Sequence, residues 1–386
     1  MERIGDTGLA WLKQFQTFGN IHDIDRAVSL LEISVSFLPE SNANLIGRLN
    51  NLGISFQSRF ERTGDIADIE NAISNQQRAI ELTPLGHPIL PSRLNSLRIS
   101  FGSRFAQSGD LADIESTISN QQRAVELTPP GHADLPSHLT KLGISFQSRF
   151  KWTGDLTDIE SAISNQQRAI ELTPPGHPDL SSRLNNLGIS FGFRFGQTRD
   201  LVNVENAISN QQRAVELTPL GPAGLSSQLN NLGISFKSRF EQTEDLADNE
   251  STISNFQRAV ELTPLGHANL PKLLNNLGNS FDSHFGQTGD LADIESAISN
   301  KQRWLLTWWI PTPCLTYVGR MKHVNICQAW REKVALKLLI WFDLYHRCAG
   351  SSHLPHGTCV QHVRAGITFI HAEYKQCVHL STGGSF

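Results

Sequence analysis

The chain has 386 residues with 33 basic and 37 acidic side chains, which gives a formal net charge of −4. This near balance gives no reason to expect nucleic acid or an anionic membrane surface as an obligate partner. The amino terminus lacks the basic start and apolar core of a signal peptide, and the longest apolar run, residues 338–342, is far too short to cross a bilayer. We therefore expect a cytoplasmic protein.

Repetition is the dominant feature of the sequence. The stretch from Leu49 to Phe56 recurs five times at intervals of 45 residues, beginning at Leu94, Leu139, Leu184, Leu229 and Leu274. A weaker copy stands at the front of the chain, where Gly8 and Trp11 align with Gly53 and Phe56. A fixed period of this length is typical of stacked supersecondary units, each too small to bury its apolar face alone. The sequence predicts about six and a half such units over residues 1–303.

Each unit reads as a helical hairpin. In the unit that begins at Pro91, apolar residues recur at helical spacing, and they are Leu94, Leu97, Phe101 and Phe105. Gly109 ends this first helix, and Asp110 is expected to cap the second, which stops at Thr128 before a proline. The loop that follows carries a histidine after glycine in four units, which we expect to cap or to be solvated: His87, His132, His177 and His267.

One face of the first helix should pack against the second helix. In the unit of Leu49 this face contains Leu52, Gly53 and Phe56, and glycine there allows two helix backbones to approach closely. Arg98 replaces that glycine in one unit, where a long cation should overpack the contact unless its head reaches solvent. We interpret this substitution as drift.

The same positions carry a family resemblance. Leu49, Leu52, Gly53 and Phe56 match the first helix of the tetratricopeptide repeat (TPR), and Ala72, Ala79 and Pro84 match its second helix. The pattern is similar to the long TPR arrays of basidiomycete fungi, many of which end in a caspase-like CHAT domain. The resemblance implies an all-α, right-handed superhelical solenoid of antiparallel helical hairpins.

Asparagine recurs on the opposite face of the first helix. The positions are Asn51, Asn186, Asn231 and Asn276, with Ile189 and Ile234 nearby, while Ser96 and Lys141 interrupt the series. A carboxamide complements a peptide unit because it both donates and accepts hydrogen bonds. TPR proteins resembling the kinesin light chain use asparagines in this way, so we expect these residues to bind an extended peptide in a concave groove. The alternative is that the asparagines bridge neighbouring helices or are only solvated.

The repeat pattern breaks at Trp304. Residues 304–386 hold all five cysteines, all three tyrosines and five of the seven tryptophans. This shift is what a changed reading frame or translated intronic sequence would produce. The other interpretation is a genuine carboxy-terminal module with a helix from Trp330 to Tyr345 that covers the last repeat.

No residue pattern indicates catalysis, a cofactor or a metal. His356 and Cys359 lie only three positions apart, whereas a CHAT protease holds its histidine and cysteine on different strands of an α/β domain that residues 304–386 are too few to form. The tail's cysteine and histidine spacing fits no standard zinc finger. The sequence therefore predicts a non-catalytic scaffold for a protein or peptide of unknown identity. Two alternatives remain, namely the regulatory array of a truncated CHAT protease and a non-functional gene product.

Overall fold

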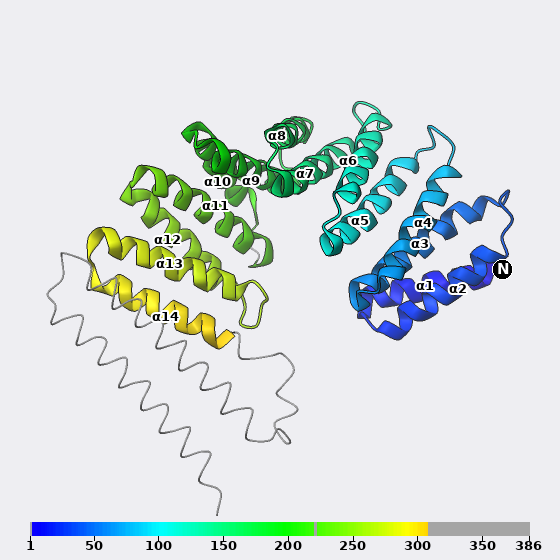
Figure 1. The fold of residues 1–386 in the computed structure, drawn as a ribbon, viewed down its shortest axis with the longest axis horizontal. Helices are drawn as coiled ribbons and strands as arrows, with labels where there is room; N and C mark the ends of the chain where they lie inside the picture. Colours follow the sequence, from blue (N-terminus) through cyan, green and yellow to red (C-terminus); the bar gives the residue numbers. More distant parts are fainter. Residues whose placement is uncertain (1, 220–221, 308–386) are drawn as a thin grey trace, which may run out of the picture. The chain divides into compact units, whose positions relative to one another are not determined.

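The computed structural model describes residues 2–219 and 222–307, and these residues form fourteen α-helices and no β-strand. Contacts between Cα atoms divide the chain into two units, Met1–Thr218 and Pro219–Phe386. In each unit, helices that follow one another in the sequence pack as pairs (Figure 1). The prediction of an all-α solenoid of helical hairpins is confirmed.

The first unit contains five hairpins. Their helices are α1 (Glu2–Phe18) and α2 (Ile21–Ser36), α3 (Ala43–Thr63) and α4 (Ile66–Glu81), α5 (Leu90–Ser108) and α6 (Leu111–Glu126), α7 (Leu135–Thr153) and α8 (Leu156–Glu171), and α9 (Leu180–Thr198) and α10 (Leu201–Leu217). The front copy of the repeat, which matches the other copies at fewer positions, therefore forms a two-helix pair like the others.

The second unit contains two described hairpins. They consist of α11 (Pro222–Thr243) with α12 (Leu246–Glu261) and α13 (Leu270–Thr288) with α14 (Leu291–Thr307). Helix α14 continues beyond position 304, where the repeat pattern breaks. A domain boundary at 303/304 stays a prediction, and the helix expected from Trp330 to Tyr345 lies outside the described residues.

Local sequence explains where the helices begin and end. Asp110 accepts a hydrogen bond from the backbone N–H of Ala112 at 3.0 Å, which caps the start of α6, and Gly109 closes α5 with a left-handed φ of 69°. Pro91 occupies the first turn of α5. These features confirm the hairpin boundaries predicted from the sequence.

The loop histidines act as caps. The Nδ1 atom of His87 accepts the backbone N–H of Ile89 at 3.2 Å, and the same bond recurs two residues after His132, His177 and His267 at 3.1–3.2 Å. The ring thus satisfies an otherwise free donor at the approach to the next first helix. This confirms the capping role.

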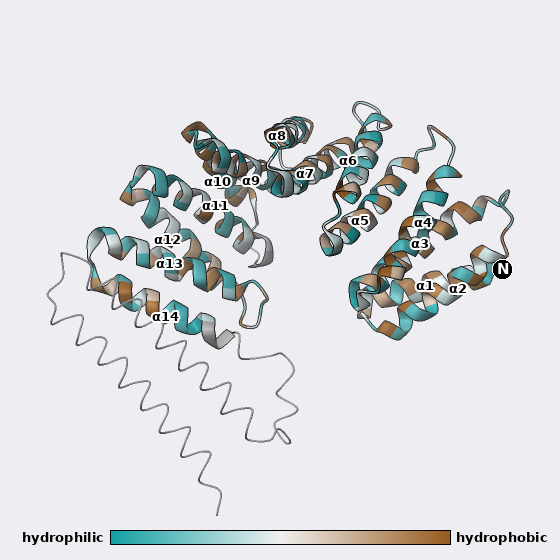
Figure 2. Ribbon diagram, viewed as in Figure 1, coloured by the Kyte–Doolittle hydropathy of each residue, from teal (hydrophilic) through white to brown (hydrophobic). Residues whose placement is uncertain are grey.

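The core of the first unit consists of several buried clusters, and the two largest are shared between successive hairpins. Leucines and phenylalanines of the first helices meet isoleucines and alanines of the second helices. Figure 2 shows hydrophobic and hydrophilic residues side by side on these helices. Leu52 and Phe56 of α3 share one cluster with Ile69 of α4 and Leu94 of α5. Each hairpin therefore completes its core only with its neighbour, as the repeat period predicts.

Candidate functional site

The contact between the two helices of a hairpin depends on glycine. A Cβ atom built on Gly53 would lie 2.6 Å from Cγ of Gln76 and 3.0 Å from the carbonyl oxygen of Ala72. Gly143 and Gly188 meet the equivalent glutamine and carbonyl at 2.6–3.1 Å. The predicted reason for glycine at this position is confirmed, since no side chain fits without displacement.

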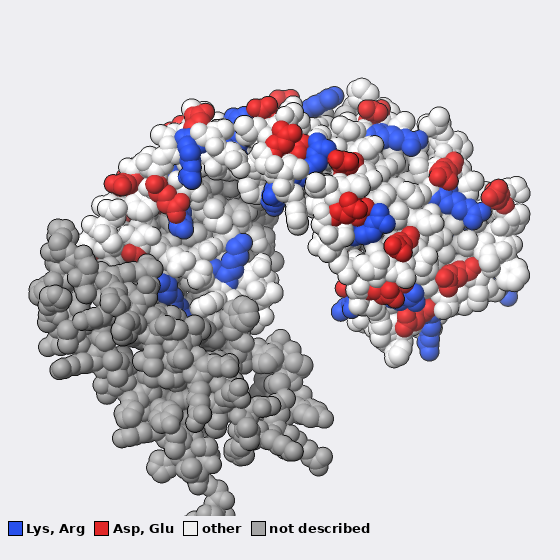
Figure 3. Space-filling view, viewed as in Figure 1, with Lys and Arg blue, Asp and Glu red and all other residues white. Residues whose placement is uncertain are grey.

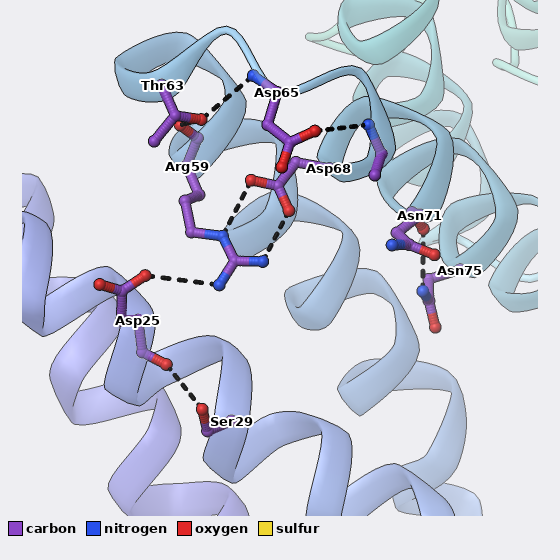
Figure 4. A network of polar contacts seen from close by, with 9 residues as sticks. Asp25, Ser29, Arg59, Thr63, Asp65, Asp68, Asn71 and Asn75 are labelled. Carbon is purple, nitrogen blue, oxygen red and sulfur yellow. Dashed lines mark hydrogen bonds and ion pairs between the residues drawn. The ribbon is translucent and has the colours of Figure 1, made fainter.

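An ion pair between arginine and aspartate spans the turn within four of the described hairpins, and the sequence reasoning missed it (Figure 4). Arg59 of α3 donates from Nε and Nη2 to the carboxylate of Asp68 in the first turn of α4, at 2.9 and 2.6 Å. Asp25 of the preceding hairpin accepts from Nη1 of the same guanidinium at 3.4 Å. The side chain of Asp68 is 4% exposed, so the pair is partly desolvated.

The same pair recurs with its members nine positions apart in the sequence. It joins Arg104 to Asp113, Arg149 to Asp158 and Arg239 to Asp248, whereas Asn203 faces Arg194 and His284 faces Asp293. Wherever the first of these two positions is arginine, the guanidinium also lies 5.3–5.7 Å from the ring of the phenylalanine one turn earlier. The arginines are Arg59, Arg104, Arg149, Arg194 and Arg239. The recurrence of Arg and Asp at one spacing in the repeats was the signal that could have revealed this contact.

The predicted binding residues fall into two sets because they belong to different units. Asn51, Asn186 and Ile189 lie in the first unit, and Asn231, Ile234 and Asn276 lie in the second. All six stand on first helices, where the asparagines and Ile189 are half-buried and Ile234 is exposed. We call the surface formed by these positions and their equivalents the first-helix face. Asn51 and Asn186 are therefore described within the first unit, and Asn231 and Asn276 within the second.

The asparagines differ in what they contact. Asn51 lines a cavity of about 400 Å³ together with Leu9 of α1 and Arg93 of α5. Asn276 donates from Nδ2 to Oδ1 of Asn230 on α11 at 3.0 Å, so it bridges neighbouring first helices. The backbone carbonyl of Asn186 accepts a hydrogen bond from the side chain of Gln147 at 3.1 Å. A role in binding stays a prediction for all of them.

Arg98 does not escape into solvent. The side chain is half-buried, its Nε lies 3.4 Å from Oδ1 of Asn95, and burial lowers the pKa of the guanidinium. Gln121, the glutamine opposite, keeps both side-chain polar atoms buried without a partner in the described part of the chain. The hairpin thus accommodates the arginine in a half-buried position beside Asn95.

The described residues offer little else that could carry chemistry. Within residues 2–219 and 222–307, no cluster of three or more His, Cys, Asp or Glu side chains could hold a metal ion. None of the described helices combines the length and apolar character needed to cross a bilayer. Basic and acidic side chains of the first unit alternate over the face seen in Figure 3, with no single-sign patch.

Comparisons with known proteins show the fold. No family model matches the chain. The carboxy-terminal part of a TPR repeat-containing protein from Cytophaga hutchinsonii is 12% identical, with a TM-score of 0.50 over 80% of this chain and 100% of that one. BtubC from P. vanneervenii is 17% identical, with a TM-score of 0.46 over 69% of this chain and 97% of that one.

A short match to enzymes was also found. Chitin synthase csmA of Emericella nidulans is 63% identical over 38 residues, which cover 10% of this chain and 2% of the enzyme. Chitin synthase 5 of Verticillium dahliae is 55% identical over 38 residues and is likewise covered over 2% of its length. The chain thus spans a very small part of these curated relatives. The described residues of this protein have the fold of a tetratricopeptide-like helical repeat array, with units of 45 residues in place of 34.

Proposed function

We propose that the protein is a non-catalytic scaffold that binds an extended peptide, or an extended segment of a partner, on its first-helix face. The observation that supports this most directly is the cavity beside Asn51. It is bounded by successive first helices, and it joins an amide to the aliphatic side chain of Leu9 and the guanidinium of Arg93.

The chemistry of this face suits a peptide backbone. Asparagine supplies a donor and an acceptor, and isoleucine at the next helical turn supplies apolar contact, so that main-chain recognition and side-chain pockets alternate. Stacked hairpins repeat this combination along their length, which is how helical repeat proteins provide extended binding surfaces. Ile54 is half-buried against the core of the preceding hairpin, so the packing of that core fixes the position of this side chain.

The proposal is tested by selecting ligands from a phage-displayed library of random, unstructured peptides on the full chain. Synthetic copies of the selected peptides are then titrated against Asn51→Ala, Asn186→Ala, Asn231→Ala and Asn276→Ala variants by fluorescence anisotropy. Loss of one bidentate amide contact should weaken binding about tenfold in at least one variant, which corresponds to about 1.4 kcal/mol.

Asparagines on the second helices provide matched controls. Asn75, Asn165, Asn210 and Asn255 each donate to the backbone carbonyl four residues earlier at 2.8 Å and lie away from the first-helix face. Their alanine variants should bind as the wild type does. Equal affinity in all eight variants, or selection of no peptide at all, would contradict the proposal.

A further inference from the structure

A cavity opens between the second helices α4 and α6. It measures about 480 Å³, and its lining combines buried apolar side chains with polar ones. The apolar members are Ile80 of α4 and Leu97 and Phe101 of α5, which are 3–8% exposed. The polar members include Glu81 of α4 and Glu115 of α6. We call this cavity the α4/α6 groove, and its rims are second helices, unlike those of the first-helix face.

The groove carries more negative than positive charge. Its lining contains two carboxylates, Glu81 and Glu115, and one guanidinium, that of Arg123. Neither carboxylate forms an ion pair within the part of the chain that the structure describes. The hydrogen bond to Asp158 is the main reason why the pKa of Arg149 is raised, and Glu115 adds only its charge. The groove therefore keeps a net negative charge.

An exposed tryptophan lies at the turn beside this groove. Trp152, at the end of α7, is 62% exposed, and its ring lies edge-on to that of Phe105 with 5.4 Å between the ring centroids. A Cβ atom on Gly109 would lie 3.4 Å from the indole, so the tryptophan covers the turn between α5 and α6. Four other hairpins carry glutamine at this position, namely Gln107, Gln197, Gln242 and Gln287. The repeat itself therefore does not require tryptophan here.

Leu111 and Glu115 lie between the tryptophan and the groove. Leu111 is 42% exposed and follows Gly109 by two positions, and Glu115 lies one turn later on the same side of α6. Asp110, the exposed cap of α6, adds a negative charge. We call Trp152, Leu111 and the α4/α6 groove together the second-helix surface, and all of it belongs to the first unit. Exposed apolar side chains rimmed by polar groups are typical of interaction sites.

We propose that the second-helix surface binds a basic amphipathic segment of a partner protein, in which Leu or Phe recurs beside Lys or Arg. An apolar side chain of the segment packs on Leu97 and Phe101 in the groove, and its cations pair with Glu81 and Glu115. Trp152 offers an aromatic face to either kind of side chain. A second copy of this chain fits less well, because its own second-helix surface carries the same negative charge. The surface is separate from the first-helix face, so this inference stands independently of the proposed function.

The test titrates a synthetic amphipathic peptide of leucine and lysine, about four helical turns long, against the full chain by fluorescence anisotropy. The wild type should bind this lysine peptide with an affinity that falls as the salt concentration rises, and it should not bind the counterpart with glutamate in place of lysine. Trp152→Gln introduces the residue of four other hairpins and should weaken binding about tenfold. Glu81→Gln and Glu115→Gln should each weaken it about threefold, because each removes one partly exposed ion pair.

Hairpin α9/α10 provides matched controls. Leu201 and Glu205 occupy the positions of Leu111 and Glu115 and are likewise exposed, in a hairpin whose first helix ends without tryptophan. Leu111→Ser should weaken binding about fivefold through lost apolar contact, whereas Leu201→Ser and Glu205→Gln should leave it unchanged. Trp152→Phe keeps an aromatic ring and should retain most of the affinity. Amide hydrogen exchange of α6, α7 and α10 reports folding in each variant.

The outcomes decide between this surface and its alternatives. Equal affinity of wild type, Trp152→Gln and Leu111→Ser for the lysine peptide would place binding elsewhere and overturn the proposal. No measurable affinity for that peptide, or equal affinity for the glutamate peptide, would overturn it as well. Self-association of the wild type that Trp152→Gln abolishes would assign the surface to a second copy of the chain instead. Peptides selected on the first-helix face should not compete with the lysine peptide, so either proposal can fail while the other stands.

Discussion

Hairpins α3/α4 and α5/α6 are built on the same plan but differ at one position where their two helices meet. Both close their turn with the same ion pair, Arg59 with Asp68 in one and Arg104 with Asp113 in the other. At the position where Gly53 of α3 lets α4 approach closely, α5 carries Arg98. The contact at the turn thus repeats, while the contact between the helices differs. The comparison shows which contact both hairpins keep and which one a hairpin can alter.

Exchanging the glycine and the arginine should give the largest effect. Gly53→Arg forces a side chain within 3.0 Å of the carbonyl oxygen of Ala72, so it should destabilise α3/α4 by about 2–4 kcal/mol through overpacking and a buried charge. Arg98→Gly should change stability by less than about 1 kcal/mol, because lost helix propensity opposes the relief of burial. Local hydrogen exchange of each hairpin measures both changes.

Gly47 provides the matched control for the first of these variants. It lies on the same helix, and a Cβ atom there would meet no heavy atom within 4 Å. Gly47→Arg should therefore leave α3/α4 as stable as in the wild type, or slightly more stable, because arginine favours the helix. Equal losses for Gly53→Arg and Gly47→Arg would show that the close approach of α3 and α4 does not limit residue choice at Gly53.

The next largest loss of stability is expected from breaking the ion pair that both hairpins share. Arg59→Met leaves the buried carboxylate of Asp68 without its main partner, which should cost about 2–4 kcal/mol. Arg194→Met removes the same cation opposite Asn203, a neutral acceptor at 2.6 Å, and should cost only about 1 kcal/mol. Urea unfolding followed by hydrogen exchange in α4 and α10 compares them. The comparison fails if the two losses are equal.

A stabilising substitution is expected where the two hairpins are alike. Gln76 and Gln121 are fully buried, and both polar atoms of each lack a partner in the described structure. Gln76→Met keeps the volume and removes the unsatisfied amide, which should stabilise α3/α4 by about 1 kcal/mol. In the second unit Phe256 occupies this position at 1% exposure, so an apolar side chain is compatible with the fold.

Gln166 is the control for that substitution. Its Oε1 accepts a hydrogen bond from Ser190 at 2.7 Å, so Gln166→Met loses a contact as well as an unsatisfied group. The gain should be smaller than for Gln76→Met or absent. Thermal and urea unfolding would contradict this reasoning if Gln166→Met stabilised the chain more than Gln76→Met does.

Local signals explain what the sequence could predict. The period of 45 residues, Gly109, Asp110 and the glycine at Gly53 act within one hairpin, so their consequences follow from helical geometry alone. The bridge from Asn276 to Asn230 and the cavity beside Asn51 depend on how far apart successive first helices stand. That spacing is set by side-chain packing between hairpins, for example around Arg98, and no pattern within one repeat encodes it. The division into two units was not predicted either.

The smallest expected effect is a pH dependence of the stability of α7 that its neighbours do not share. Burial is the main cause that lowers the pKa of His138, the charge of Lys141 adds to it with a smaller contribution from His132, and Asp134 opposes it. Because the folded pKa lies below the unfolded value of about 6.5, the unfolded chain binds more protons between these two values. The stabilisation from the neutral ring is thus present above about pH 6.5 and is lost as the pH falls through the folded pKa.

Hydrogen exchange of α7 should therefore show protection that falls with pH in this window, once corrected for the intrinsic exchange rate. The fall should be smaller in His138→Gln and in Lys141→Asn, whereas α9, which carries Arg183 at the equivalent position, should show none from this source. Identical pH slopes in wild type and His138→Gln would mean that the imidazole is not the group that makes α7 acid-sensitive.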